Sequence, residues 1–147
     1  MLTSKGCEQT QHMFHIAKSD YQYAQFGMEH LDKETRSCEN QICYVFQQSG
    51  EKLLKAFLWS SGKKPAKTHN MSDLFGACLD VDPTLELIQD SCMVLQGFVA
   101  FARYPESEEH FCDQEDVFDA HQAANQILQI ISPLIEKNLF SAPCPEE

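Results

Sequence analysis

The sequence predicts an all-α protein, an up-and-down antiparallel bundle of about five helices, four of them long and one short. Three observations support this prediction. Apolar residues recur at alternating spacings of three and four along most of the chain, which is the period of a helix packed on a core. No segment alternates apolar and polar residues as a strand does. Gly, Pro, Asn and Asp residues that favour turns separate the periodic segments.

The first two helices are expected over residues 8–31 and 36–61. The first carries an apolar stripe to which three aromatic residues add bulk: Met13, Ile16 or Ala17, Ala24, Met28 and Leu31, with Tyr21, Tyr23 and Phe26. Asp20 falls near this stripe, where it either pairs with a lysine of the second helix or is an exposed charge. Gly62 and then Pro65 end the second helix, because Gly adopts the left-handed conformation and Pro cannot continue a helix.

The last three helices begin at Asn70, at Asp82–Pro83 and at Asp113, which are residues that cap helix N-termini. The fourth helix carries the most regular apolar seam of the chain, five turns long: Leu85, Ile88, Cys92, Leu95, Val99 and Ala102. Pro133 lies inside the pattern of the fifth helix and predicts a kink or a break near Ser132. We expect one domain over residues 1–140 and a disordered tail over residues 141–147.

Composition argues against several classes of protein. No apolar run reaches the roughly 18 residues of a transmembrane helix, and the N-terminus lacks the apolar core of a signal peptide, so we expect a cytoplasmic protein that is not bound to a membrane. The formal net charge of −11 argues against a protein that coats DNA or RNA non-specifically. Seven cysteines without a Cys-x-x-Cys pair argue against a zinc site. Reduced thiols, no metal and no cofactor are therefore expected.

The charges are distributed unevenly along the chain. Five of the eleven basic residues fall within sixteen positions: Lys52, Lys55, Lys63, Lys64 and Lys67. Eleven of the twenty-two acidic residues lie from Asp80 to Asp119, where Arg103 is the only base. This pattern indicates a basic face and an acidic face, although a solvated helix end would also explain the lysine cluster.

Polar residues interrupt the apolar face in the middle of the second helix: Gln47, Gln48, Ser49, Glu51, Lys52 and Lys55. Gly50 lies among them and costs about 1 kcal/mol relative to Ala in a helix. Two interpretations remain open. The polar residues form part of a site, or Gly50 lets a neighbouring helix approach while the polar residues face water.

Three motifs in this chain resemble those of the HEPN family, small helical domains named for higher eukaryotes and prokaryotes and for nucleotide binding. They are the segment from Gln48 to Ala56 in the second helix, Lys67-Thr68-His69-Asn70 before a short helix with Leu74, and Ala102-Arg103-Tyr104-Pro105. The motifs occur in the family's order within a resemblance that extends from about residue 8 to 137. The resemblance implies a helical bundle that forms a homodimer and binds a nucleotide or RNA.

Many HEPN proteins are ribonucleases with an Arg, four to six residues, and then a His. Carried onto this chain, the catalytic pair is Arg103 and His110, which flank six residues. A His can take the proton from a ribose 2′-OH that attacks the adjacent phosphate. A guanidinium can hold the phosphate oxygens and the charge that builds in the transition state. Such cleavage needs no metal.

The chain also departs from the ribonuclease pattern. Tyr104 and Pro105 follow the Arg, a variant that resembles members paired with small, minimal nucleotidyltransferases. In those systems the nucleotidyltransferase modifies a Tyr two residues after the His, and Cys112 stands there in this chain. Three acidic residues lie in the same loop: Glu106, Glu108 and Glu109. In the alternative interpretation, Arg103 pairs with one of these Glu residues and His110 is solvated.

The residues expected to bind a nucleotide or RNA are Gln48, Glu51, Lys52, Lys55, His69 and Tyr104. Structural interpretations stand beside this one. Glu51 and Lys55 are four apart on a helix and can form a salt bridge, and His69 can hold its loop.

The leading functional hypothesis is a HEPN-domain protein that binds a nucleotide or RNA and is the toxin-like partner of a minimal nucleotidyltransferase. The first alternative is a metal-independent endoribonuclease that uses Arg103 and His110 at a dimer interface. The second is a non-catalytic helical interaction module whose acidic face meets a basic partner.

Overall fold

The structure is a computed structural model that describes residues 2–32, 38–99 and 112–141. Within these ranges it contains five α-helices and one 3₁₀ helix and no strand. The elements are α1 (Ser4–Glu29), α2 (Glu39–Ser60), α3 (Met71–Val81), the 3₁₀ helix η2 (Pro83–Ile88), α4 (Gln89–Gln96) and α6 (Gln114–Ser141). The predicted all-α bundle is therefore confirmed.

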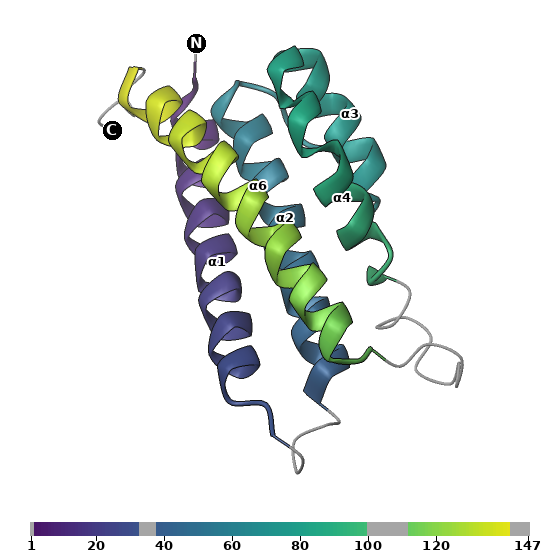
Figure 1. The fold of residues 1–147 in the computed structure, drawn as a ribbon. Coiled ribbons are helices and arrows are strands. Elements are labelled where there is room, and N and C mark those ends of the chain that lie inside the picture. The colour runs from purple at the N-terminus through teal and green to yellow at the C-terminus, as the bar shows by residue number, and fades with distance from the viewer. Residues whose placement is uncertain (1, 33–37, 100–111, 142–147) are drawn as a thin grey trace.

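α1, α2, α4 and α6 alternate in direction, and α2 packs against each of the other α-helices (Figure 1). The antiparallel pairs are fixed by side chains, since Lys52 of α2 meets Asp20 of α1 and Ser91 of α4 meets Gln126 of α6. This confirms that Asp20 pairs with a lysine of the second helix.

α3 runs in the same direction as α2 rather than against it. His69, just before α3, contacts Glu51 in the middle of α2, and Cys78 near the end of α3 contacts the carbonyl of Leu54, further along α2. The connection over residues 61–70 therefore runs back along α2 before α3 begins. This return brings the connection to the polar part of α2.

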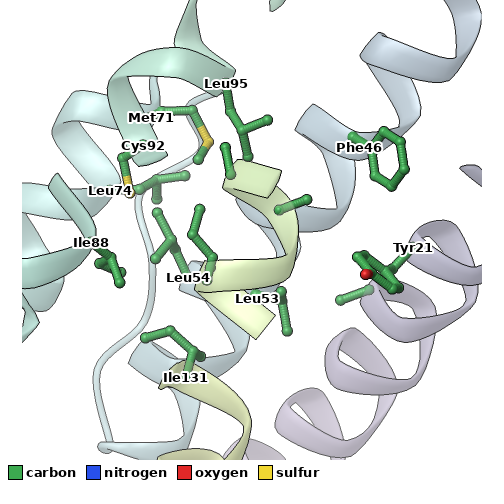
Figure 2. Close-up of a cluster of buried hydrophobic side chains, with 14 of the residues drawn as sticks. Tyr21, Phe46, Leu53, Leu54, Met71, Leu74, Ile88, Cys92, Leu95 and Ile131 are labelled. Carbon is green, nitrogen blue, oxygen red and sulfur yellow. The ribbon is translucent and has the colours of Figure 1, made fainter. Parts of the chain in front are cut away.

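The core lies where α2 faces α1, α3, α4 and α6, and it is filled mainly by aliphatic side chains, with aromatic rings such as Tyr21 and Phe46 on the side of α1 (Figure 2). A Cβ on Gly50 would lie 2.5 Å from Cδ1 of Leu95 and 3.5 Å from Cδ1 of Ile127. Gly50 thus allows the close approach of α4, as one interpretation of the sequence held. The other half of that interpretation, that the polar residues around Gly50 face water, is wrong for Gln47, Ser49 and Glu51, which are buried.

The predicted capping residues are confirmed. Asn70 accepts the backbone N–H groups of Ser72 and Asp73, Asp82 accepts that of Thr84, and Asp113 accepts that of Asp116. Gly62 has φ of 77°, the left-handed conformation that ends α2.

Several details of the first two helices differ from the predictions. α1 begins at Ser4 rather than residue 8, because Thr3 caps it by accepting the N–H of Gly6. Within the described residues α2 begins at Glu39 rather than residue 36. Tyr23 and Phe26 do not add bulk to the core, since they are 70% and 62% exposed. The predicted stripe of α1 is confirmed at Ala17 and Ala24, which are buried, and Met13, Met28 and Leu31 pack against the core. The buried face also includes Cys7, Thr10, Phe14 and Tyr21.

The fourth predicted helix is not a continuous α-helix. Its first six residues form η2, and α4 ends at Gln96 before a turn at Gly97 and Phe98. A 3₁₀ helix repeats every three residues, so Leu85 and Ile88 still share one face and remain buried beside Cys92 and Leu95 of α4. Ala102 lies outside the described residues.

α6 is not broken at Pro133, because the helix is continuous to Ser141. The alternative, a kink near Ser132, stays a prediction. Proline removes the hydrogen bond to the carbonyl four residues earlier, which is that of Gln129. Gln129 and Pro133 are both exposed, so water can bond this carbonyl and the helix tolerates the proline. The predicted tail lies outside the described residues beyond Ser141.

Cys43, Cys78 and Cys92 are buried free thiols, as the apolar pattern predicted. Burial raises the pKa of Cys92 to about 12 and raises that of Cys78 as well, so both behave as small hydrophobes. Cys7 differs from the expectation of reduced thiols, since its sulfur is disulfide-bonded. None of the described helices has the length and apolar character needed to cross a bilayer.

Replacing Gly50 by Val should lower the free energy of unfolding by about 2 kcal/mol, because the new side chain overpacks the contact with the buried Leu95. Urea denaturation measures this change. The matched control is Gly76→Ala in α3, where a Cβ meets nothing within 4 Å. It should stabilise the protein by about 0.5–1 kcal/mol through helix propensity. Equal effects of the two substitutions would contradict the close approach at Gly50.

Candidate functional site

A buried carboxylate lies at the centre of the polar segment of α2. The side chain of Glu51 is 7% exposed, and its oxygens meet Nζ of Lys55 at 3.3 Å and Nδ1 of His69 at 3.1 Å. Burial of a carboxylate is unfavourable unless cationic or hydrogen-bonding partners accompany it. Glu51 therefore fixes both the rotamer of Lys55 and the position of the connection that carries His69.

Two adjoining hollows open beside this carboxylate, and we call them together the polar cleft. They share His69 and Val99 and have volumes of about 60 Å³ and 340 Å³. The smaller is lined by Tyr44, Gln47, Gln48, Glu51, His69 and Val99. The larger is lined by Lys67, Thr68, His69, Asn70, Gln96 and Val99.

The N-terminus of α3 borders the polar cleft but its backbone donors are already bonded. Gln96 accepts the N–H of Met71 at 2.6 Å, and Asn70 accepts those of the next two residues. The side chains that border the cleft are therefore the groups available to a ligand, rather than the helix N-terminus. Among them, the amide of Gln48 donates to the hydroxyl of Tyr44 at 2.9 Å, which orients both.

The structure brings together three of the predicted binding residues, Gln48, Glu51 and His69, and places Lys55 against Glu51. It does not bring Lys52 to them, because Nζ of Lys52 lies 2.5 Å from Oδ2 of Asp20 on α1. The remaining predicted residues lie outside the described part of the chain and stay predictions: Arg103, Tyr104 and His110, with Cys112 as the first described residue after them.

The structural interpretations of two site residues are confirmed by these contacts. Glu51 and Lys55 form the expected salt bridge four residues apart. His69 holds its connection to α2 through Glu51. Both roles are compatible with a binding site, since Glu51 and His69 also line the polar cleft.

Other lining residues were not predicted, among them Tyr44 and Gln96. Gln47 belongs to the polar segment of α2 that one interpretation of the sequence made part of a site. Tyr44 is detectable in retrospect, because it precedes Gln48 by four residues and therefore shares its helical face. Gln96 carries no such signal, since only the packing of α4 against the start of α3 places it in the cleft.

A second polar cluster joins α1 to α6. The hydroxyl of Tyr21 donates to Oδ1 of Asn125 and lies 3.1 Å from Nε2 of His121. Burial lowers the pKa of His121, while the charge of Glu29 partly opposes this shift. Burial also raises the pKa of Tyr21. Within the described residues, no group of His, Cys, Asp or Glu is arranged to hold a metal ion.

Fold and cleft together define a small all-helical domain with a polar site on its second helix. A family model described as HEPN domain matches residues 10–135. The chain belongs to the HEPN domain family, as its three motifs indicated. No curated protein and no solved structure shows significant similarity to the chain.

The substitution Glu51→Gln should lower the free energy of unfolding by about 2 kcal/mol, because it leaves the half-buried Lys55 without its carboxylate. Lys55→Met should destabilise the protein for the reciprocal reason. In the double variant the losses should be less than additive by about 1 kcal/mol or more. Urea denaturation of the four proteins measures this coupling, with Lys63→Met at an exposed position as control. Additive losses would show that the pair is not coupled.

The lowered pKa of His121 makes stability dependent on pH. Below about pH 6.5 the unfolded chain protonates this His more readily than the folded chain does. Stability should therefore be full above that pH and decrease as the pH falls toward 5. His121→Gln removes the titration, so its urea midpoint should decrease less between pH 7.5 and 5 than that of the wild type. Identical decreases would assign the pH dependence to other groups.

Proposed function

We propose that this HEPN-domain protein binds a nucleotide or RNA in the polar cleft and is the toxin-like partner of a minimal nucleotidyltransferase. The observation that carries the binding proposal is the buried Glu51, fixed by Lys55 and His69, at the wall of an open polar hollow. A hollow with a few oriented polar groups is the usual form of a small-molecule site.

The lining groups suit the parts of a nucleotide. Amide and hydroxyl groups, such as those of Gln48 and Tyr44, can pair with base edges or with ribose hydroxyls. Lys67 lines the larger hollow, where an ammonium can hold a phosphate. The smaller hollow has room only for an edge of a base or ribose, so the body of the nucleotide is assigned to the larger hollow, where Lys67 can hold its phosphates.

The arrangement of charge also supports a short ligand. Lys52 and Lys55 are paired with acidic residues. Lys63, Lys64 and Lys67 are exposed on the connection before α3 and form no ion pair within the described part of the chain. Three lysines can attract a nucleotide or an RNA end locally, whereas a net charge of −11 opposes the extended contact of nucleic-acid coating.

One observation favours cleavage of RNA as a second candidate function. Val99 lines both hollows of the polar cleft, and the chain continues from it into residues 100–111, which include Arg103, Tyr104 and His110. Family resemblance supplies the roles of general base for His110 and phosphate ligand for Arg103, and it also supplies the homodimer and the nucleotidyltransferase partner. These roles and partners, and a cytoplasmic location, remain predictions.

Titration calorimetry with ATP, GTP and a short single-stranded RNA tests the binding proposal. Lys67→Ala should weaken the affinity for the bound ligand about tenfold, because a charge-assisted hydrogen bond to phosphate contributes about 1.5–3 kcal/mol. Lys137→Ala changes the net charge equally at an exposed position of α6 and should change the affinity less than twofold.

Failure of all three ligands to bind at millimolar concentration, or equal weakening by the two lysine variants, would refute the site. The same RNA, incubated with the protein in EDTA, tests the second candidate. Cleavage that Arg103→Ala and His110→Ala each abolish would establish the endoribonuclease, and binding without cleavage would leave the binding function alone.

A further inference from the structure

A second open groove lies between α4 and α6, and we call it the acidic groove. Among the residues that the structure describes, it shares none of its lining with the polar cleft. It has a volume of about 510 Å³ and is lined by Asp90, Ser91, Val94, Asp119, Gln122, Ala123 and Gln126. Ser91 donates a hydrogen bond to Gln126 across its base, and Ser91 and Ala123 are buried there. The base is therefore rigid, while the walls are open to a partner.

The two carboxylates of the acidic groove stand on different helices, Asp90 on α4 and Asp119 on α6. Neither forms a hydrogen bond or an ion pair through its side chain in the described structure. No Lys or Arg occurs in residues 83–96 or 114–136, and Lys137 of α6 comes eighteen residues after Asp119, so neither helix places a Lys or Arg beside these carboxylates. The carboxylates thus give the groove a negative potential that nothing in these helices neutralises.

Apolar side chains accompany this charge. Val94 is 40% exposed in the groove, and Ala123 contributes to its base. Phe118 precedes Gln122 by four residues on α6, so it extends the same helical face, and it is 54% exposed. Leu87, in the 3₁₀ helix η2 just before α4, is 53% exposed. Solvated carboxylates alone would need no partner, but this combination of exposed apolar and acidic groups is typical of a docking surface.

We propose that the acidic groove docks a cationic amphipathic helix of a partner protein. The groove between two antiparallel helices accepts the apolar stripe of a third helix against Val94 and Ala123. Lys or Arg residues on the flanks of that stripe meet Asp90 on one wall and Asp119 on the other, and this charge complementarity sets the register.

The charges argue against the other occupants. In a twofold contact of this groove with a second copy, the carboxylates would face their own counterparts, which is destabilising. RNA and anionic lipid surfaces carry the same sign of charge as the groove and are repelled. A basic protein segment is the occupant that the groove complements.

Fluorescence anisotropy with a labelled synthetic peptide tests the proposal on the full chain. The peptide has about 18 residues, or five helical turns, with Leu on one face and Lys on the flanks, and its matched control carries Glu in place of Lys. The Lys peptide should bind, and the Glu peptide should not. The double variant Asp90→Asn/Asp119→Asn should weaken binding of the Lys peptide at least tenfold.

A variant with the same net charge separates docking from general attraction to an acidic protein. Glu8 and Glu136 are exposed and lie outside the groove, so Glu8→Gln/Glu136→Gln should change the affinity less than twofold. Val94→Arg, which places a cation in the groove, should also weaken binding at least tenfold while circular dichroism shows the fold retained.

The proposal is overturned if the Asp90→Asn/Asp119→Asn protein binds the Lys peptide as tightly as the wild type does, or if both double variants lose equal affinity. It is also overturned if sedimentation shows a wild-type dimer that Val94→Arg dissociates, since the occupant is then a second copy. Binding of ATP, GTP or RNA in the polar cleft is measured separately, so its failure leaves this result unchanged.

Discussion

The burial of one carboxylate constrains the arrangement of this bundle. Glu51 lies on α2, the helix that packs against all the other described α-helices, one residue after the glycine that admits α4. A carboxylate in that place requires cationic or hydrogen-bonding partners. Lys55 supplies one from the same helix, but His69 comes from a separate segment. Gln47 also donates a hydrogen bond to Glu51 from the same helix. The contact with His69 holds the connection after Gly62 where it returns along α2 before α3 begins.

The polar cleft is a consequence of that return. Because the connection over residues 61–70 runs beside α2, its side chains and those of α2 face one another across an open space instead of packing as two helices would. Asn70 and Gln96 accept the backbone N–H groups at the N-terminus of α3, where this helix borders the cleft. Glu51 and His69, which hold the connection against α2, also line the cleft.

The sequence predicted what depends on local chemistry. Helical periodicity, the caps at Asn70, Asp82 and Asp113, and the left-handed Gly62 each depend on a few neighbouring residues. Periodicity found the buried face of α1 at Ala17 and Ala24 but did not distinguish its aromatic residues, since packing buries Tyr21 and exposes Tyr23. The family motifs placed residues of α2 and His69 in one expected site. In the structure His69, eighteen residues after Glu51, contacts that residue. The place of Gln96 depended on tertiary packing alone.

Three consecutive residues of α4 connect the core with both surfaces. Leu95 is fully buried over Gly50, Val94 before it lines the acidic groove, and Gln96 after it lines the polar cleft. Successive residues on a helix point about 100° apart, so seating Leu95 over Gly50 also determines the directions of its two neighbours. The absence of a side chain at one position of α2 therefore fixes how the two surfaces are oriented relative to each other. A larger residue there would meet the buried side chain of Leu95, which lies between the residues that line the two surfaces.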